Sequence, residues 1–162
     1  MPSALDESTA ADLLPGTWVI AATNFPMWLS GERREPRFSY ELVSTDPLVL
    51  SDEVQYVTAE GEQKRIIGKD TWRHDEFVWR GKGILKPFTS RWHIAGAADD
   101  GTVLVIRFDK SLATPAGIDV VVREGTSHPE LRKAVARGTD AFGLSPEEFG
   151  SLTWFTAAPT KG

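Results

Sequence analysis

The feature that most constrains the fold is a succession of short β-rich runs between Trp18 and Arg123. Turn residues break these runs about every ten positions, a spacing typical of an all-β barrel or sandwich. Helix signals are nearly absent from this stretch. The expected strands are 17–24, 37–44, 51–59, 63–69, 71–80, 84–87, 90–96, 102–109 and 117–123.

Short links join these runs. The links 60–62, 81–83 and 99–101 each contain glycine, which supplies the positive φ of a hairpin turn without steric cost. Sequential strands with short links form an up-and-down meander, and about eight such strands can close around one small ligand. We therefore expect an all-β fold, a closed antiparallel up-and-down β-barrel of about 8–10 strands.

A different pattern follows the strands. Residues 129–142 carry an apolar stripe at helical spacing, which predicts one amphipathic α-helix packed on the outside of the barrel. Ser127 or His128 can cap it, Pro129 suits its first position, and Gly143 provides a left-handed exit. A capping box at 145–148 begins a second short helix, and 152–155 is short and strand-like.

Three features taken together resemble the lipocalin family of the calycin superfamily. They are Gly16-Thr17-Trp18 at the head of the first strand, Arg123 at the end of the last main strand, and the helix that follows. The resemblance implies that Arg123 stacks on Trp18 to close the barrel floor. No Thr-Asp-Tyr-type signature occurs near 98–103, so the chain is closer to an outlying bacterial-type lipocalin, or to a fatty-acid-binding or nitrobindin-like relative.

Composition limits the classes of partner and the cellular compartment that we expect. The net charge of −5, from 18 basic and 23 acidic residues, argues against nucleic acid as a partner. No run is long enough to span a membrane, and zero cysteines favour a reducing, cytoplasmic compartment. We expect a disordered lead-in over 1–14, one barrel domain over 15–156 and a flexible tail over 157–162, in a monomer or homodimer.

The aromatic content points to the ligand. Six tryptophans and eight phenylalanines could line a cavity that holds a small hydrophobic or aromatic molecule. The segment 24–37 is long for a hairpin link and apolar in part, so we expect it to cover the mouth as a lid. The expected ligand-binding residues are Phe25, Met27, Trp28, Tyr40, Tyr56, Trp72, Phe77, Trp79, Trp92 and Ile106.

Two alternatives to simple binding remain open at this stage. The first is a lipocalin-fold enzyme, a cyclase or isomerase of secondary metabolism, with proton transfer by His93, Tyr56, Tyr40 or Glu76. The second is haem carriage through His93, the histidine most apt to be partly buried. No histidine spacing suits a metal site, and no cofactor motif is present, so the leading hypothesis requires neither a metal nor a cofactor.

Overall fold

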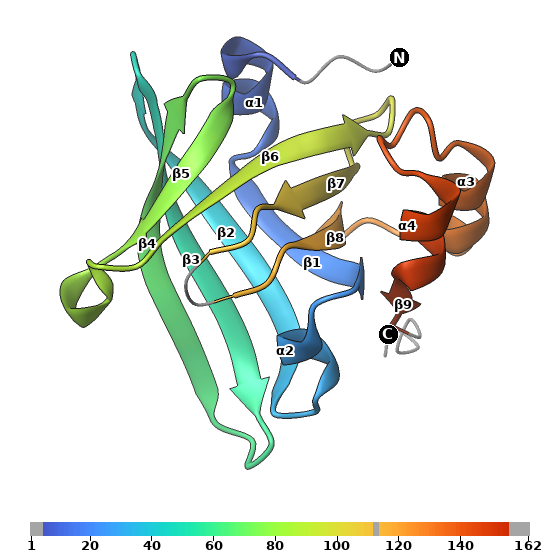
Figure 1. Ribbon diagram of the computed structural model, residues 1–162, viewed down its shortest axis with the longest axis horizontal. Coiled ribbons are helices and arrows are strands. Elements are labelled where there is room, and N and C mark those ends of the chain that lie inside the picture. Colours follow the sequence, from blue (N-terminus) through green and yellow to red (C-terminus); the bar gives the residue numbers. More distant parts are fainter. Residues whose placement is uncertain (1–4, 112–113, 156–162) are drawn as a thin grey trace.

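The computed structural model describes residues 5–111 and 114–155, and it has the architecture of a closed barrel (Figure 1). Every neighbouring pair of strands is antiparallel, and β1 pairs with both β2 and β8, which closes the sheet. The barrel strands are β1 (Gly16–Thr23), β2 (Arg33–Thr45), β3 (Leu48–Thr58), β4 (Gln63–Arg73), β5 (Glu76–Gly81), β6 (Thr89–Ala97), β7 (Val103–Phe108) and β8 (Gly117–Arg123). The predicted up-and-down β-barrel is confirmed.

The division of the chain between 63 and 80 differs from the prediction. One strand, β4, covers the whole of the expected run 63–69 and the first three residues of 71–80, and a tight turn separates it from β5. His74 and Asp75 form this turn with φ values of 50° and 66°. Aspartate and histidine enter the left-handed region more readily than most residues, so the chain reverses here without a glycine.

The expected strand 84–87 is wrong. Residues Gly83–Leu85 form a single 3₁₀ turn, η1, within the link from β5 to β6. Gly81, the last residue of β5, packs closely against this turn. An added Cβ at Gly81 would lie only 2.4 Å from the Cβ of Leu85. The link 81–83 is therefore the start of a longer connection and not a tight hairpin, whereas Gly61 and Gly101 adopt the expected positive φ in their hairpins.

The N-terminal segment also departs from the prediction, because it contains a helix where a disordered lead-in was expected over 1–14. Helix α1 (Glu7–Leu13) begins at Asp6, whose carboxylate accepts a 2.8 Å hydrogen bond from the Thr9 amide. Ala10 and Leu14 lie one helical turn apart and are fully buried in the interior of the barrel. Burial of this apolar face explains why the segment is ordered.

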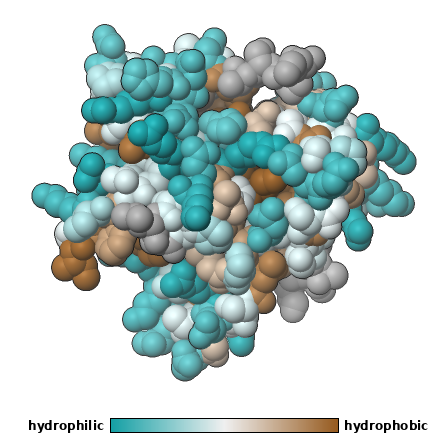
Figure 2. Space-filling model, viewed as in Figure 1, coloured by the Kyte–Doolittle hydropathy of each residue, from teal (hydrophilic) through white to brown (hydrophobic). Residues whose placement is uncertain are grey.

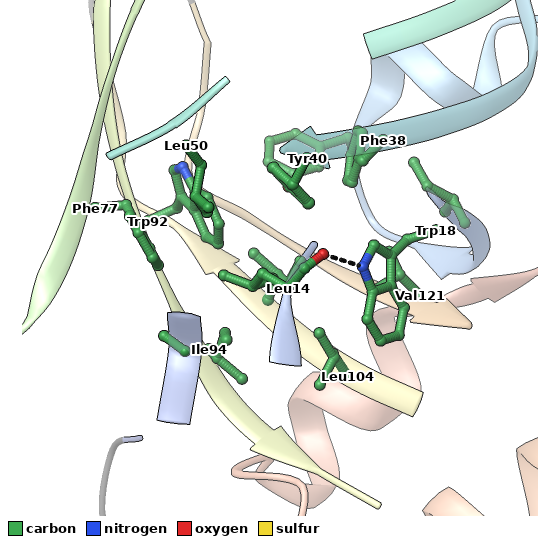
Figure 3. Close-up of a cluster of buried hydrophobic side chains, with 14 of the residues drawn as sticks. Leu14, Trp18, Phe38, Tyr40, Leu50, Phe77, Trp92, Ile94, Leu104 and Val121 are labelled. Carbon is green, nitrogen blue, oxygen red and sulfur yellow. Dashed lines mark hydrogen bonds between the residues drawn. The ribbon is translucent and has the colours of Figure 1, made fainter. Parts of the chain in front are cut away.

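The floor of the barrel joins α1 to both ends of the sheet. The indole nitrogen of Trp18 donates a 2.9 Å hydrogen bond to the Leu14 carbonyl (Figure 3). The guanidinium carbon of Arg123 lies 4.3 Å from the Trp18 ring centre, and its nitrogens donate to the carbonyls of Leu13 and Pro15. The expected stacking of Arg123 on Trp18 is thus present, with α1 as its third partner.

A second apolar core lies outside the barrel. Helices α3 (Leu131–Arg137) and α4 (Pro146–Ser151) cover the outer face of β1, β7 and β8 (Figure 1), and β9 (Thr153–Trp154) adds a short strand to β1. The C-terminal helix is confirmed but is shorter than 129–142, begins after Glu130 and has no side-chain cap. The capping box at Ser145 is as predicted. Gly143 has the predicted positive φ, but it does not end the helix, whose C-cap is Gly138.

The outer surface is mainly hydrophilic in the view of Figure 2. Hydrophobic atoms gather at the projecting tip over η1, where Ile84 is 92% exposed. Among the described helices, none is long and apolar enough to cross a membrane.

Candidate functional site

Aromatic rings from four strands pack against one another in the interior of the barrel, and Figure 3 labels three of them, Tyr40, Phe77 and Trp92. Phe77 and Trp92 are cross-strand partners on β5 and β6, and their rings stack with centres 4.5 Å apart. Tyr40 of β2 stacks on the other side of Trp92 at 5.6 Å, while Trp72 of β4 meets Phe77 edge-on at 5.0 Å. These rings form a continuous aromatic wall that a flat or apolar molecule could join.

A second group of rings lies at the link between β1 and β2, which is at the end of the barrel away from α1 (Figure 1). The link between β1 and β2 is shorter than the expected 24–37, because β2 already begins at Arg33. This link, residues 24–32, contains the short helix α2 (Pro26–Leu29) and is called the lid below. From the lid, Trp28 packs near Phe38 and Tyr56 with centres 6.5 and 6.3 Å away, and Phe25 meets Phe108 at 5.3 Å. The lid therefore places two buried aromatic side chains in the mouth.

All ten predicted ligand-binding residues lie in the interior cluster or against it. Six of them are buried members of that cluster, namely Phe25, Trp28, Tyr40, Phe77, Trp92 and Ile106. The other four are partly buried and pack against it, namely Met27, Tyr56, Trp72 and Trp79. In an unbroken strand 71–80, Trp72 would lie on the opposite face from Phe77 and Trp79, and the sequence does not say which face points inward. The turn at 74–75 brings all three rings to the inward face.

The four predicted catalytic residues do not meet in one place. Tyr40 and Tyr56 face the interior, but His93 alternates with the inward-facing Trp92 and lies opposite Arg107, on the outer face of the sheet. Glu76 also points outward and pairs with Arg91 at 3.1 Å. His93 and Glu76 are therefore not placed to transfer a proton to a molecule inside the barrel.

The same placement bears on the haem alternative. His93 points away from the interior, so a haem enclosed by the barrel would lack the iron ligand that this hypothesis assigned. Within residues 5–111 and 114–155, no group of three or more histidine, aspartate or glutamate side chains is arranged to hold a metal ion.

Three carboxyl groups lie in the interior of the barrel, and the sequence patterns had not singled them out. Asp70 and Asp119 are 0% exposed and Asp52 is 5% exposed. They project inward from β4, β8 and β3, each two residues from an apolar or aromatic side chain of the interior cluster, namely Trp72, Val121 and Leu50. Carboxyl groups are almost never fully buried without a cationic partner, so this cluster requires an explanation.

Asp52 and Asp70 lie within hydrogen-bonding reach of each other on neighbouring strands. Two carboxylates cannot share a hydrogen bond unless one carries a proton, and without that proton Asp52 Oδ1 and Asp70 Oδ2 have no donor in the described part of the chain. The Trp92 indole donates a 2.9 Å hydrogen bond to Asp70 Oδ1. Burial raises the pKa of Asp52 to about 6, and burial together with the charge of Asp52 raises the pKa of Asp70 well above its usual range.

Asp119 lies nearer the lid, opposite Thr23 of β1. Burial raises the pKa of Asp119 to about 7, and the Thr23 hydroxyl has a smaller effect that lowers it. Neither carboxyl oxygen of Asp119 has a hydrogen-bond partner of good geometry within the described residues. Tyr40 is influenced by all three acids. Its pKa is raised well above 10.0, first by burial and then by the negative charges of Asp52, Asp70 and Asp119.

A signal for these acids exists in the sequence. Asp119 interrupts an otherwise apolar run in 117–122, and Asp52 follows Leu48 and Leu50 at the period of two that defines an inward face. Asp70 occupies the same face as Trp72. A lone acid at an inward position of an apolar strand is the pattern that would have identified them.

A hollow of about 380 Å³ lies beside β2, β3 and β4 and is open to solvent. Its lining is largely charged and includes Arg37, Glu53 and Arg65. Because this lining does not suit an apolar molecule, the ring-lined interior is the better candidate site.

The closed barrel, its floor of Trp18 and Arg123 and its external helices define the lipocalin fold. The solved structures that resemble the chain include the amine-binding protein of Rhodnius prolixus in complex with tryptamine, with TM-score 0.67 and 10% identity over 95% of this chain and 84% of that one. Lobster apocrustacyanin A1 superposes with TM-score 0.64 and 9% identity, over 92% of this chain and 80% of its own. The cockroach allergen Per a 4 gives TM-score 0.61 and 14% identity, over 91% of this chain and 87% of that chain.

These likenesses are in the backbone and not in the sequence. No protein-family model matches the chain, and no curated protein matches it. Identities of 9–14% with these structures show a shared fold alone.

Proposed function

We propose that the protein binds a small, largely apolar or aromatic organic molecule in the interior of its barrel. The observation that carries this proposal is the aromatic wall of Tyr40, Trp92 and Phe77, which is buried in the interior of the barrel and reaches the Phe25 ring of the lid through Phe108. Stacked rings offer a large apolar area and a preferred geometry to a flat ligand. The amine-binding protein with a similar backbone holds tryptamine, which supports small-molecule binding by this fold.

The lid is the proposed entrance. Trp28 is buried among Phe38 and Tyr56, yet its indole nitrogen has no hydrogen-bond partner in the described residues. A buried indole N–H without an acceptor is costly, so the closed position of Trp28 is less stable than its packing alone suggests. Outward movement of α2 would hydrate this N–H and open the mouth of the barrel.

Binding of a neutral dye tests this function. Nile red is expected to bind with one-to-one stoichiometry in isothermal titration calorimetry and to quench tryptophan fluorescence. Trp28→Ala is expected to speed dye association in stopped-flow measurements, because it removes the side chain that fills the mouth. Leu29→Ala is the matched control, since Leu29 belongs to the same helix but is 41% exposed.

Two outcomes would argue against the proposal. Failure of Nile red and of a panel of apolar probes to bind would mean that the interior is only a structural core. Equal association rates for Trp28→Ala, Leu29→Ala and the unaltered protein would leave binding intact but would remove the lid from the entry route.

A cytoplasmic location remains a prediction, supported by the absence of cysteine.

A further inference from the structure

The interior of the barrel holds buried carboxyl groups but, among the described residues, no buried basic side chain. Asp52, Asp70 and Asp119 are the buried charged residues of the described chain, and no lysine, arginine or histidine is buried with them. The ion pairs found within 5–111 and 114–155 involve none of the three. Burial of a carboxylate is unfavourable unless a cation or hydrogen-bond donors compensate for lost water.

The available protein donors do not complete the hydrogen bonding of these groups. The Trp92 indole donates a hydrogen bond to one oxygen of Asp70. No hydrogen-bond partner among the described residues is found for Asp70 Oδ2, for Asp52 Oδ1 or for either oxygen of Asp119. These acceptor oxygens belong to side chains of three different strands, and all three side chains point into the interior. Asp119 provides an observation independent of the Asp52–Asp70 pair, because it lies on β8 beside Thr23.

Aromatic faces accompany the acids. Trp92, which donates to Asp70, is stacked between Tyr40 and Phe77. An ammonium group is attracted both to carboxylates and to the faces of aromatic rings, and both attractions strengthen in a site that excludes water. A neutral apolar ligand would use the rings and leave the carboxyl oxygens unsatisfied.

We infer that the ligand is an organic cation, an aromatic or apolar body bearing a protonated amine, whose ammonium group is held by Asp52 and Asp70. This inference rests on the proposed function, because it specifies the chemical class of the molecule that the barrel binds. The body of the ligand would lie against the aromatic wall. Asp119 supplies a second acceptor nearer the lid for a polar substituent.

A change in protonation accompanies this mode of binding. The titratable groups that face the pair are Tyr40 from β2 and Asp119 from β8, while β6 presents the neutral Trp92. Two carboxyl groups can share a hydrogen bond only if one of them carries a proton, and burial raises the pKa of both, so we expect the pair to hold a proton in the free protein. Entry of an ammonium group favours the doubly ionised pair, so binding releases a proton to solvent.

Three probes of one size separate charge from shape. Tryptamine is a cation at pH 7, tryptophol is its neutral analogue, and indole-3-acetate is an anion. Calorimetric titration is expected to give a dissociation constant for tryptamine at least about tenfold below that of tryptophol, with indole-3-acetate weakest. Titration in phosphate and in Tris, which differ in ionisation enthalpy, is expected to show net proton release for tryptamine alone.

Isosteric variants identify the residues responsible. Asp52→Asn and Asp70→Asn, singly and together, are expected to abolish the preference for tryptamine over tryptophol and the proton release. They retain size and relieve the burial of charge, so folding is preserved, and the single variants suffice if the double variant fails to fold. Asp99→Asn, at an exposed hairpin position, is the control and is expected to behave as the unaltered protein.

The outcomes distinguish this inference from the function on which it rests. Equal affinity for tryptamine and tryptophol, or a preference that survives both single substitutions, overturns the cation assignment while the barrel remains a binding protein. Failure of all three probes and of Nile red overturns both. Preferential binding of tryptamine without proton release contradicts the shared proton and requires a site away from Asp52 and Asp70.

Discussion

Asp70 and Trp92 are joined by a 2.9 Å hydrogen bond from the indole nitrogen to Oδ1, across the interior of the barrel from β6 to β4. The bond belongs both to the aromatic wall and to the acid pair, because Trp92 also stacks on Phe77 and Tyr40. It is the one donor that stabilises the ionised form of Asp70 among the described residues. Trp92 therefore links the shape of the site to its charge.

Trp92→Phe should separate these two roles. The substitution removes the donor and some volume, so the free energy of unfolding is expected to fall at all pH values through lost packing. An additional loss is expected as the pH rises from 5 to 9, because ionised Asp70 then has no donor. Urea unfolding at several pH values measures both losses.

Trp72→Phe provides the comparison for this prediction. Trp72 packs on Phe77 with centres 5.0 Å apart, and its indole makes no hydrogen bond to a carboxyl group in the described part of the chain. Its loss of stability is expected to be independent of pH. A parallel pH dependence in the two variants would show that the Trp92 bond does not stabilise the ionised acid.

The floor of the barrel is the second target. Trp18→Ala is expected to lower the free energy of unfolding by about 3 to 5 kcal/mol, since it empties a fully buried site and removes the bond to Leu14. Arg123→Lys is expected to cost about 1 to 3 kcal/mol, because lysine cannot both stack and reach two carbonyls. Chemical denaturation measures both, and an unchanged midpoint for Trp18→Ala would show that the floor is not part of the core.

Much of the fold could be predicted because the relevant signals are local. Gly61 and Gly101 take the positive φ that their hairpins require, and Ser145 with Glu148 forms the capping box that starts α4. Trp18 and Arg123 are far apart in sequence, but their order on the first and last main strands follows from the lipocalin pattern. Each of these features depends on one or a few residues and not on the packing of the whole chain.

The errors arise where tertiary structure overrides the local signal. His74 and Asp75 reverse the chain without glycine, so the sequence between 63 and 80 showed no break at the correct position. That turn decides which rings face inward, because a shift of one residue moves every side chain to the opposite face. The outward position of His93 follows from the same alternation, and sequence left both choices open.

The acids illustrate a different difficulty. Asp52, Asp70 and Asp119 belong to a residue type that is ordinarily found at the surface, and composition does not distinguish them from the other acidic residues among the 23 of the chain. Only closure of the barrel brings three strands together and encloses them. The candidate site could thus be predicted in its aromatic part, through the density of rings, and not in its charged part.

The lid can be loosened without altering any lid residue. An added Cβ at Gly117 would lie 2.4 to 2.6 Å from three atoms of the Phe25 ring, so Gly117→Ala is expected to displace Phe25 from the mouth. The amides of Trp28 and Ser30, which bond to the carbonyls of Phe25 and Pro26, are expected to exchange with deuterium faster.

Gly150→Ala is the control for the lid, because an added Cβ at Gly150 meets no atom within 4 Å. Its exchange in the lid is expected to match that of the unaltered protein. Unchanged exchange at Trp28 and Ser30 in Gly117→Ala would indicate that Phe25 does not hold the lid closed.

Residues on the outer face should not affect ligand affinity. His93→Ala and Glu76→Gln are expected to leave the dissociation constant of Nile red within about twofold, because both side chains lie outside the barrel. Tyr40→Leu, in the aromatic wall, is expected to weaken binding by about tenfold or more. Calorimetric titration of the three variants with Nile red measures these dissociation constants. A large loss of affinity in His93→Ala would show that His93 contributes to the binding site.

The dependence of stability on pH follows from the direction of the pKa changes. The pKa values of Asp52 and Asp119 are raised from 3.8 to about 6 and about 7, so the folded protein binds these protons more tightly than the unfolded chain. Their contribution to stability is complete below pH 3.8 and is lost as the pH rises through 6 and 7. Glu148 acts in the opposite sense, because its hydrogen bonds to Arg107 lower its pKa from 4.5 to about 2.

The unliganded protein is therefore expected to be most stable at roughly pH 4, above the range in which Glu148 gains its charge and below the range in which the interior acids lose their protons, and to lose stability as the pH rises toward 8. Asp119→Asn removes an ionisation that burial makes unfavourable, so the decline of stability with pH should be less steep, and at pH 8 this variant should be more stable than the unaltered protein by about a few kcal/mol. Asp99→Asn, which is exposed, should keep the original profile. Thermal and urea unfolding from pH 4 to 9 measure the three profiles. If Asp119→Asn declined as steeply as Asp99→Asn, the interior acid would be ionised at no cost in the folded state, and its burial would not govern stability.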